Sequence, residues 1–174
     1  MVDTLQLKMW ESRAAFLAHV EAYGARSLII GRDVEAPTAY YSCSIHDGDI
    51  DCEIAIISSG LGSSPAVVAM NGGARILVGH DTSLTSIDVN AMALVTSLSL
   101  TGVFFEFIAL DADVELVVVH ETGVLRVDAN ATTRWSVECD VIEDFVVDGQ
   151  GRLVLSTMDG AQLAISLQSG VVSR

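Results

Sequence analysis

Residues Asp111 to Asp128 read DADVELVVVHETGVLRVD, and the same design occurs three times in the chain. It consists of a turn, an apolar run, a second turn and a shorter segment that ends on a polar residue. The design recurs as NGGARILVGHDTSLTSID at 71–88 and, slightly lengthened, as DGQGRLVLSTMDGAQLAIS at 148–166. A period of about forty residues with strand-turn-strand content is typical of stacked or radially arranged β units. The sequence therefore predicts a repetitive, mainly β architecture.

Each repeat begins with a short apolar strand and continues into a nearly uninterrupted apolar run, which is typical of a strand covered on both faces. The first strands are expected at 66–70, 104–110 and 141–147, followed by turns at Asn71-Gly72, Asp111-Ala112 and Asp148-Gly149. Fourth strands are expected at 94–100 and 133–137. The third repeat stops at Arg174, so its last strand is expected to come from elsewhere.

The section 1–65 precedes the repeats and has a different pattern. Alternation at 5–9 predicts a strand. Phe16 and Val20 lie one helical turn apart, which predicts a helix over 11–23, and Gly24 is suited to end it. A second strand is expected at 27–30. We expect residues 1–174 to form a single domain, in which 66–174 contribute the three repeats.

A β-hairpin is predicted at 40–45 and 49–57, because the dipeptide Asp47-Gly48 favours a two-residue turn. Pairing outward from this turn places Cys43 opposite Cys52. One face is then apolar, and the other is expected to be solvated and acidic. A disulfide between the two cysteines is geometrically conceivable, but reduced thiols are expected in a cytoplasmic protein.

The third repeat resembles the blade of quinoprotein-type β-propellers. The resemblance consists of Trp135, the strand 141–147, the segment DGQGRLVL at 148–155, Asp159-Gly160 and residues 167–171. It implies blade-like antiparallel sheets and carries no quinone-binding residues. Three units are fewer than the usual four to eight blades. Together with the N-terminal section they would form either a small four-part propeller or an open, incomplete antiparallel assembly of the α+β class, and the open form is favoured.

The charge balance narrows the classes of partner. The chain has 23 acidic and nine basic residues, for a net charge of −14, which disfavours nucleic acid and anionic membranes and favours basic partners. The N-terminus lacks the pattern of a signal peptide, so a cytoplasmic location is expected. A hydrophobic fraction of 51% leaves apolar surface that a partner would cover.

His80 and His120 occupy the same repeat position, and each precedes an acidic residue. A zinc site needs three or four ligands, which this pattern does not supply, so no metal and no cofactor is expected. Strand-end roles are the preferred interpretation. The alternative is a pocket between repeats lined by His80, His120 and Trp135, in a small-molecule-binding module or an enzyme.

Two acidic runs are candidate docking surfaces, and they contain Asp49, Asp51, Glu53, Glu143 and Asp144. Because no catalytic motif is present, we expect a non-catalytic protein-binding module with an acidic surface. Its partner would be another protein or a second copy of the chain. An immunity-type inhibitor of a basic toxin is an alternative that suits the charge.

Overall fold

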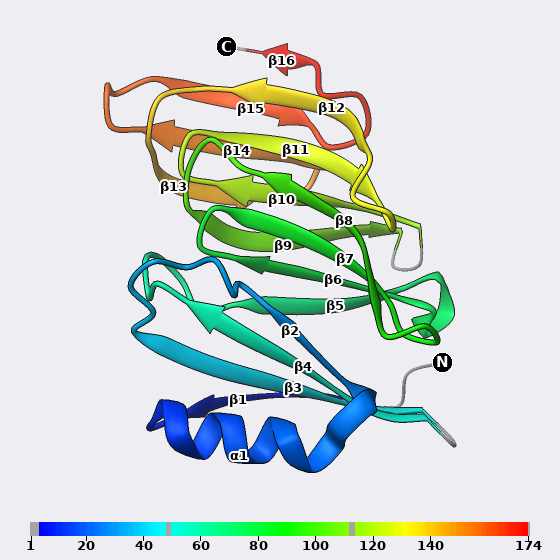
Figure 1. Cartoon of the computed structure of the whole chain (residues 1–174). Helices are drawn as coiled ribbons and strands as arrows, with labels where there is room; N and C mark the ends of the chain where they lie inside the picture. The colour runs from blue at the N-terminus through cyan, green and yellow to red at the C-terminus, as the bar shows by residue number, and fades with distance from the viewer. Residues whose placement is uncertain (1–3, 48–49, 112–113, 174) are drawn as a thin grey trace.

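The structure is a computed structural model that describes residues 4–47, 50–111 and 114–173. Within these residues there are four four-stranded sheets and one α-helix. Figure 1 shows the sheets as successive layers, with the helix at one end of the row and the C-terminal strand at the other. The expected mainly β fold with one N-terminal helix is confirmed.

The N-terminal sheet has the order β1-β3-β4-β2. Strand β2 pairs in parallel with β4, whereas the other pairs in this sheet are antiparallel. This single parallel pair is compatible with the mainly antiparallel fold that the sequence predicts. The strands of this sheet are β1 (Thr4–Trp10), β2 (Ser27–Ile30), β3 (Ala39–Asp47) and β4 (Ile50–Ser58).

Helix α1 (Arg13–Tyr23) covers the outer face of the N-terminal sheet. The Ser12 side chain accepts a hydrogen bond of 3.2 Å from the Ala15 N–H and begins the helix, and Gly24, with φ of 54°, ends it. Phe16 and Val20 are buried in a small cluster with Ala55 of β4. The predicted spacing of apolar residues therefore identifies the packed side of the helix.

The predicted hairpin is present, but its register is wrong. Asp47 pairs with Ile50, so Cys43 lies opposite Ile54 and Cys52 lies opposite Ile45. Cys43 and Cys52 are then diagonal neighbours, whose Cα atoms are about 7–8 Å apart in such pairs, too far for a disulfide. Both cysteines are free and buried. The predicted turns at Asp47-Gly48 and Asp111-Ala112 include residues outside the described ranges.

The predicted division of the hairpin into two faces is correct on one side only. The apolar face packs against the next sheet, as expected. The other face is solvated only in part: α1 lies over Ser42 and Glu53, whereas His46 and Asp51 are exposed. Ser42 and Glu53 are 2% and 0% exposed there.

The three repeats form the other three sheets, each an antiparallel meander. The second sheet contains β5 (Ala66–Met70), β6 (Arg75–His80), β7 (Ser83–Asp88) and β8 (Ala93–Ser99). The third contains β9 (Phe104–Asp111), β10 (Glu115–His120), β11 (Gly123–Asp128) and β12 (Thr133–Glu138). The C-terminal sheet contains β13 (Ile142–Val147), β14 (Arg152–Thr157), β15 (Gln162–Ser166) and β16 (Val172–Ser173).

Strand β16 completes the third repeat, so the expectation that its last strand comes from elsewhere is wrong. The chain reverses after β15 in a turn closed by the Gly170 N–H, which donates to the Ser166 carbonyl at 2.8 Å. Gly170 has φ of 72°, a conformation that favours glycine. This tight turn leaves enough chain for a short fourth strand.

Equivalent backbone hydrogen bonds join consecutive repeats. The Phe104 N–H donates to the Asp81 carbonyl at 2.6 Å, and the Ile142 N–H donates to the Glu121 carbonyl at 2.8 Å. Asp81 and Glu121 occupy the same turn in their repeats. The common design seen in the sequence therefore extends to the contacts between sheets.

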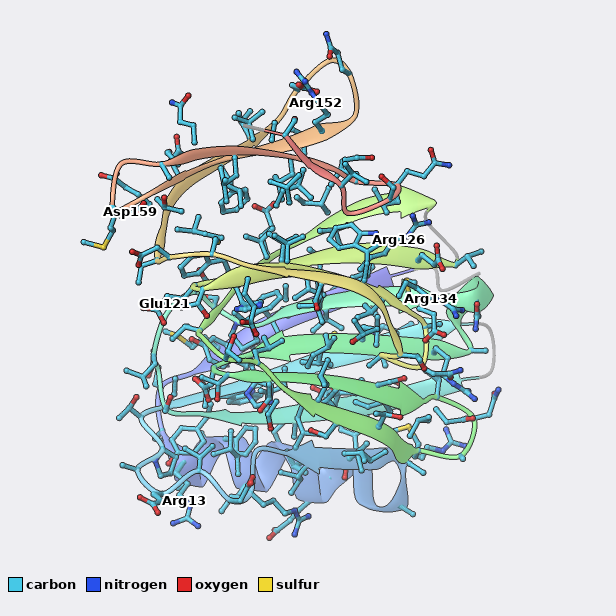
Figure 2. All side chains as sticks on the ribbon, turned by 90° about the horizontal axis from the view of Figure 1, so that it is seen from above. Arg13, Glu121, Arg126, Arg134, Arg152 and Asp159 are labelled. Carbon is cyan, nitrogen blue, oxygen red and sulfur yellow. The ribbon has the colours of Figure 1, made fainter. Side chains whose placement is uncertain are left out.

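The hydrophobic core is divided into layers that follow the chain. Separate buried clusters join the N-terminal sheet to the second, the second to the third, and the third to the C-terminal sheet. Figure 2 shows the side chains that fill these spaces. No such cluster of the described residues joins the first sheet to the last. The four layers thus form an open row, and the outer face of the C-terminal sheet has no layer over it.

Candidate functional site

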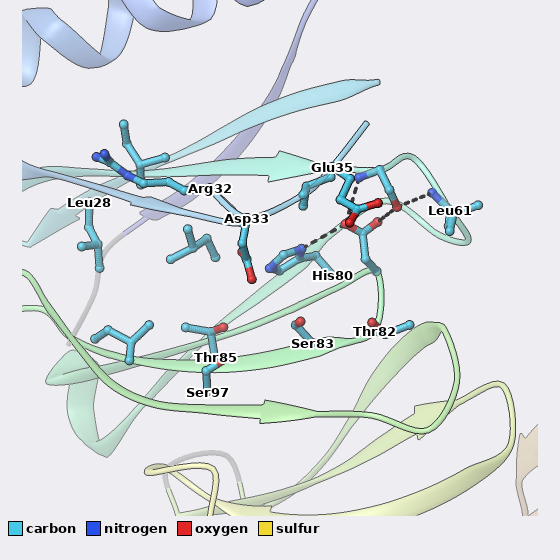
Figure 3. A pocket seen from close by; sticks show the side chains of 17 residues that line it. Leu28, Arg32, Asp33, Glu35, Leu61, His80, Thr82, Ser83, Thr85 and Ser97 are labelled. Atoms are coloured by element: carbon cyan, nitrogen blue, oxygen red, sulfur yellow. Dashed lines mark hydrogen bonds and ion pairs between the residues drawn. The ribbon is translucent and has the colours of Figure 1, made fainter. Parts of the chain in front are cut away.

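A pocket of about 800 Å³ lies between the N-terminal sheet and the second sheet (Figure 3). One wall comes from β2 and the segment that follows it, and the other comes from β6, β7 and β8. This volume is within the range of small-molecule sites. The residues that define its chemistry are Leu28, Ile30, Asp33, His80, Thr85 and Ser97.

Strand alternation places His80 on the wall of this pocket. His80 shares the face of Ile76 and Val78, which pack against the N-terminal sheet. The side chain is 4% exposed, and its Nδ1 has no hydrogen-bond partner among the described residues. The nearest charged atom is Asp81 Oδ2, 3.5 Å away, which is longer than a hydrogen bond. A buried imidazole with an unused nitrogen therefore lines the pocket.

Asp81 is held firmly beside His80. Its Oδ1 accepts from the hydroxyls of Ser58 and Ser59, each at 2.8 Å, and its Oδ2 accepts from the Ser59 N–H at 2.9 Å. Burial alone would raise the pKa of Asp81, but these hydrogen bonds outweigh burial and lower it. Asp81 is thus a carboxylate at neutral pH. Because its backbone φ is 45°, the turn that carries it is also conformationally restricted.

Burial lowers the pKa of His80, while the carboxylates of Asp81 and Asp33 oppose that effect. The net direction is downward, so His80 is a neutral imidazole at pH 7. A neutral imidazole has one donor and one acceptor nitrogen. The pocket therefore offers both kinds of hydrogen-bonding group next to a fixed carboxylate.

His120 is the equivalent residue of the next repeat, but its surroundings differ. It lies on the face of Leu116 and Val118, toward the second sheet, and is 6% exposed. Burial lowers its pKa, against the carboxylates of Glu138 and Glu121. It borders a hollow of about 130 Å³, far smaller than the His80 pocket.

The predicted pocket shared by His80, His120 and Trp135 is wrong. The two histidines lie in different sheets and border different hollows. Trp135 lies in the cluster between the third and C-terminal sheets, where its ring is so close to Gly170 that a Cβ there would be 2.7 Å from Cδ2. Each residue faces a different interlayer space, because successive repeats stack in sequence. The third repeat has Thr157 at the histidine position, bonded to Asp159 at 2.5 Å.

The predicted acidic sites separate into exposed and buried groups. Glu143 and Asp144 are exposed on β13, and Asp51 is exposed and lies 3.1 Å from His46 Nδ1. Asp49 lies outside the described residues. Glu53 is fully buried, so the prediction that it belongs to a solvated docking surface is wrong.

Glu53 instead forms a polar contact under α1. Its Oε1 lies 3.1 Å from His19 Nε2, and its Oε2 has no partner among the described residues. The His19 ring is 4.6 Å from the Trp10 ring, and Trp10 donates to the Ser42 hydroxyl at 3.0 Å. The sequence did not show this contact, because it depends on where the helix packs.

Metal ligands do not gather in the described part of the chain. No group of three or more histidine, cysteine, aspartate or glutamate side chains there could hold a metal ion. Burial raises the pKa of the Cys43 thiol to about 12. This thiol is therefore protonated and unreactive at neutral pH.

The helices in the described part of the chain are not of the kind that crosses a membrane. Helix α1, with 11 residues, is too short to cross a bilayer, and none of the helical segments described is long and apolar enough to do so.

Comparison with known proteins identifies the fold. The chain matches no protein-family model, and no curated protein matches it by sequence. The dihydro-heme d1 dehydrogenase NirN, solved in complex with DHE, matches with a TM-score of 0.54 and 15% identity over 78% of this chain and 34% of that chain. Hydrazine synthase of Kuenenia stuttgartiensis matches with a TM-score of 0.51 and 14% identity over 87% of this chain and 48% of that chain.

The chain thus spans less than two thirds of either matched structure. At such low identity the likeness concerns the fold alone. The predicted resemblance to β-propeller-type repeats is confirmed at that level: the chain has a propeller-like repeat fold.

Proposed function

We propose that this chain is a non-catalytic protein-binding module that docks a partner protein on the outer face of its C-terminal sheet. The observation that carries the proposal is that this sheet face has no covering layer. The N-terminal sheet has α1 on its outer face, and each inner face has a neighbouring sheet.

The strand register defines the uncovered face. Val146 pairs with Val154, and Val154 pairs with Ala164, so these three side chains form one row across the sheet. They lie opposite to the face of Leu153 and Leu155, which packs inward. Val146 is 60% exposed. Val154 and Ala164 are half-buried, and an apolar row of this kind on an uncovered sheet face is suited to packing against another protein.

The charge next to this row favours a basic partner. Asp144 pairs with Ser156 in the neighbouring row of the same face, and Glu143 is exposed beside it. A second copy would bring the same carboxylates into the contact, whereas a partner with an apolar centre and a basic rim would complement them. The net charge of −14 would increase its rate of association.

We place this binding in the cytoplasm. Cys43, Cys52 and Cys139 are all unpaired, as expected for a protein of a reducing compartment.

The test is a quantitative capture experiment with the wild-type chain and two variants. Val146→Asp places a charge in the row, and Val95→Asp is the matched control on β8, where Val95 is 40% exposed. A protein retained by wild type and Val95→Asp but lost from Val146→Asp supports the proposal. Light scattering of the same samples shows whether that partner is a second copy. Identical captured proteins for all three chains, with a monomeric mass throughout, would contradict it.

A further inference from the structure

The pocket at His80 has features of a ligand site that the proposed protein-binding role does not use. It lies between the first two sheets, whereas the proposed docking face belongs to the last. A ligand in this pocket would therefore not occupy the proposed docking face. The features that indicate such a ligand are the charge of the pocket, its hydroxyl groups and the unused nitrogen of His80.

The carboxylates of the pocket lack local counterions. Asp33 and Glu35 line it on the N-terminal side, and neither forms an ion pair with any residue in the described ranges. Arg32 is the cation of the lining, but Figure 3 shows its guanidinium directed away from His80, while the Asp33 side chain points toward the histidine. The site therefore attracts positive charge.

Hydroxyl groups form the opposite wall. Thr85 on β7 pairs with Ser97 on β8, so their side chains share the face that looks into the pocket, and Ser83 lies two residues before Thr85 on the same face. Figure 3 shows all three below the His80 ring. Their hydroxyls make no side-chain hydrogen bond to the rest of the described chain. These hydroxyls remain available to a ligand that can both donate and accept hydrogen bonds.

His80 supplies the observation that distinguishes this site from a solvated acidic surface. Its side chain is 4% exposed, and its Nδ1 faces the Asp81 carboxylate at 3.5 Å, so Nε2 is the ring nitrogen left for a ligand. His120 also has an Nδ1 without a hydrogen bond among the described residues, but it borders a far smaller hollow, so the space beside the ring is what distinguishes His80.

We propose that this pocket binds a small organic amine that carries hydroxyl groups, of the class of an amino sugar. The ammonium lies against Asp33 and Glu35, and the ligand hydroxyls bond to Ser83, Thr85 and Ser97. His80 completes the hydrogen bonds from the buried end. The apolar side chains of Leu28, Ile30 and Leu94 contact the carbon skeleton. A metal ion is not the ligand, because the described residues contain no suitable group of ligands.

The experiment is calorimetric titration of the full chain with glucosamine, galactosamine and serinol, each compared with its N-acetyl form. Acetylation removes the positive charge but keeps the hydroxyls. We expect at least one amine to bind saturably and its N-acetyl form to bind at least tenfold more weakly. Failure of all three amines to bind, or equal binding of an amine and its N-acetyl form, would overturn the proposal.

Variants locate the binding. Asp33→Asn is expected to weaken the amine at least fivefold, and Glu35→Gln to weaken it less. The matched control is Glu106→Gln, an exposed acid on β9 of the third sheet, which is expected to leave the affinity unchanged. Circular dichroism checks that each variant is folded. Unchanged affinity in Asp33→Asn and Glu35→Gln, or equal loss in Glu106→Gln, would show that the amine binds elsewhere.

Discussion

His80 and His120 occupy the same position in consecutive repeats and lie in different environments. Both end the second strand of their sheet, both are buried, and both face the preceding layer. His80 borders about 800 Å³ of space and His120 about 130 Å³. The repeat therefore determines how each histidine is buried, and the preceding layer determines whether there is room beside it.

The two histidines face different layers. The layer that His120 faces is a repeat, whereas the layer that His80 faces, the N-terminal sheet, is not. His120 faces the second sheet, where Leu98 of β8 and Leu100, just after that strand, lie beside it. His80 faces the N-terminal sheet, where the parallel strand β2 leads into the loop that contains Asp33. A non-repetitive layer packed against a repetitive one leaves a gap with polar walls. We regard this junction as the place where the molecule can acquire specific chemistry.

The largest expected effect concerns the acidic residue after each histidine. Asp81→Ala removes a carboxylate that accepts three hydrogen bonds, from Ser58 and Ser59, whereas Glu121 accepts one from the Val103 N–H at 3.4 Å. We expect Asp81→Ala to lower the free energy of unfolding by about 3 kcal/mol and Glu121→Ala to lower it by less than about 1 kcal/mol. Urea denaturation of both variants measures the difference. Equal losses would mean that the two turns are equivalent despite their different contacts.

The pH dependence of stability tests whether burial lowers the pKa of both histidines. Burial lowers both pKa values, so between the folded value and the ordinary value near 6.5 the unfolded chain binds more protons. Stability is then fully present above pH 6.5 and falls as the pH decreases below it. The slope contributed by each histidine is at most about 1.4 kcal/mol per pH unit.

Denaturation of wild type, His80→Asn, His120→Asn and the double variant between pH 7.5 and 5 measures these contributions. Each single variant is expected to have a shallower slope than wild type, and the double variant the shallowest. Asp81 contributes separately at lower pH, because its lowered pKa confers stability that is lost as the pH falls below about 4. An unchanged slope in the double variant would show that other groups cause the pH dependence.

The sequence predicted the repeated part of the molecule well. Turn residues and apolar runs located the strands of all three repeats, and Phe16, Val20 and Gly24 located the helix. The hairpin register was wrong because Asp47-Gly48 favours a turn at Asp47, whereas Asp47 belongs to β3 and pairs with Ile50. Local turn preference did not decide between two registers that bury the same side chains.

The site was less predictable, since it depends on packing between layers. The repeat identified His80, but Asp33 reaches it from the loop after β2 and Ser97 from β8, and neither residue carries a local motif. Alternating polar residues at Ser83 and Thr85 in a strand with buried neighbours were the available signal. The buried Glu53 was mistaken for a solvated acid for a related reason: period-two alternation identifies a strand face but does not show what covers that face.

The variants with the smallest expected effect on stability give the sharpest comparison of the hollows beside His80 and His120. Ser97 and Ser136 are exposed serines that line the large and the small hollow, respectively. Each change to phenylalanine is expected to alter the free energy of unfolding by less than about 0.5 kcal/mol, because neither side chain is in the core. Ser97→Phe fills the pocket and is expected to abolish amine binding in the calorimeter, whereas Ser136→Phe leaves it unchanged. If Ser97→Phe retained full affinity, the space beside His80 would not be where the amine binds, and the difference between the two histidines would concern packing alone.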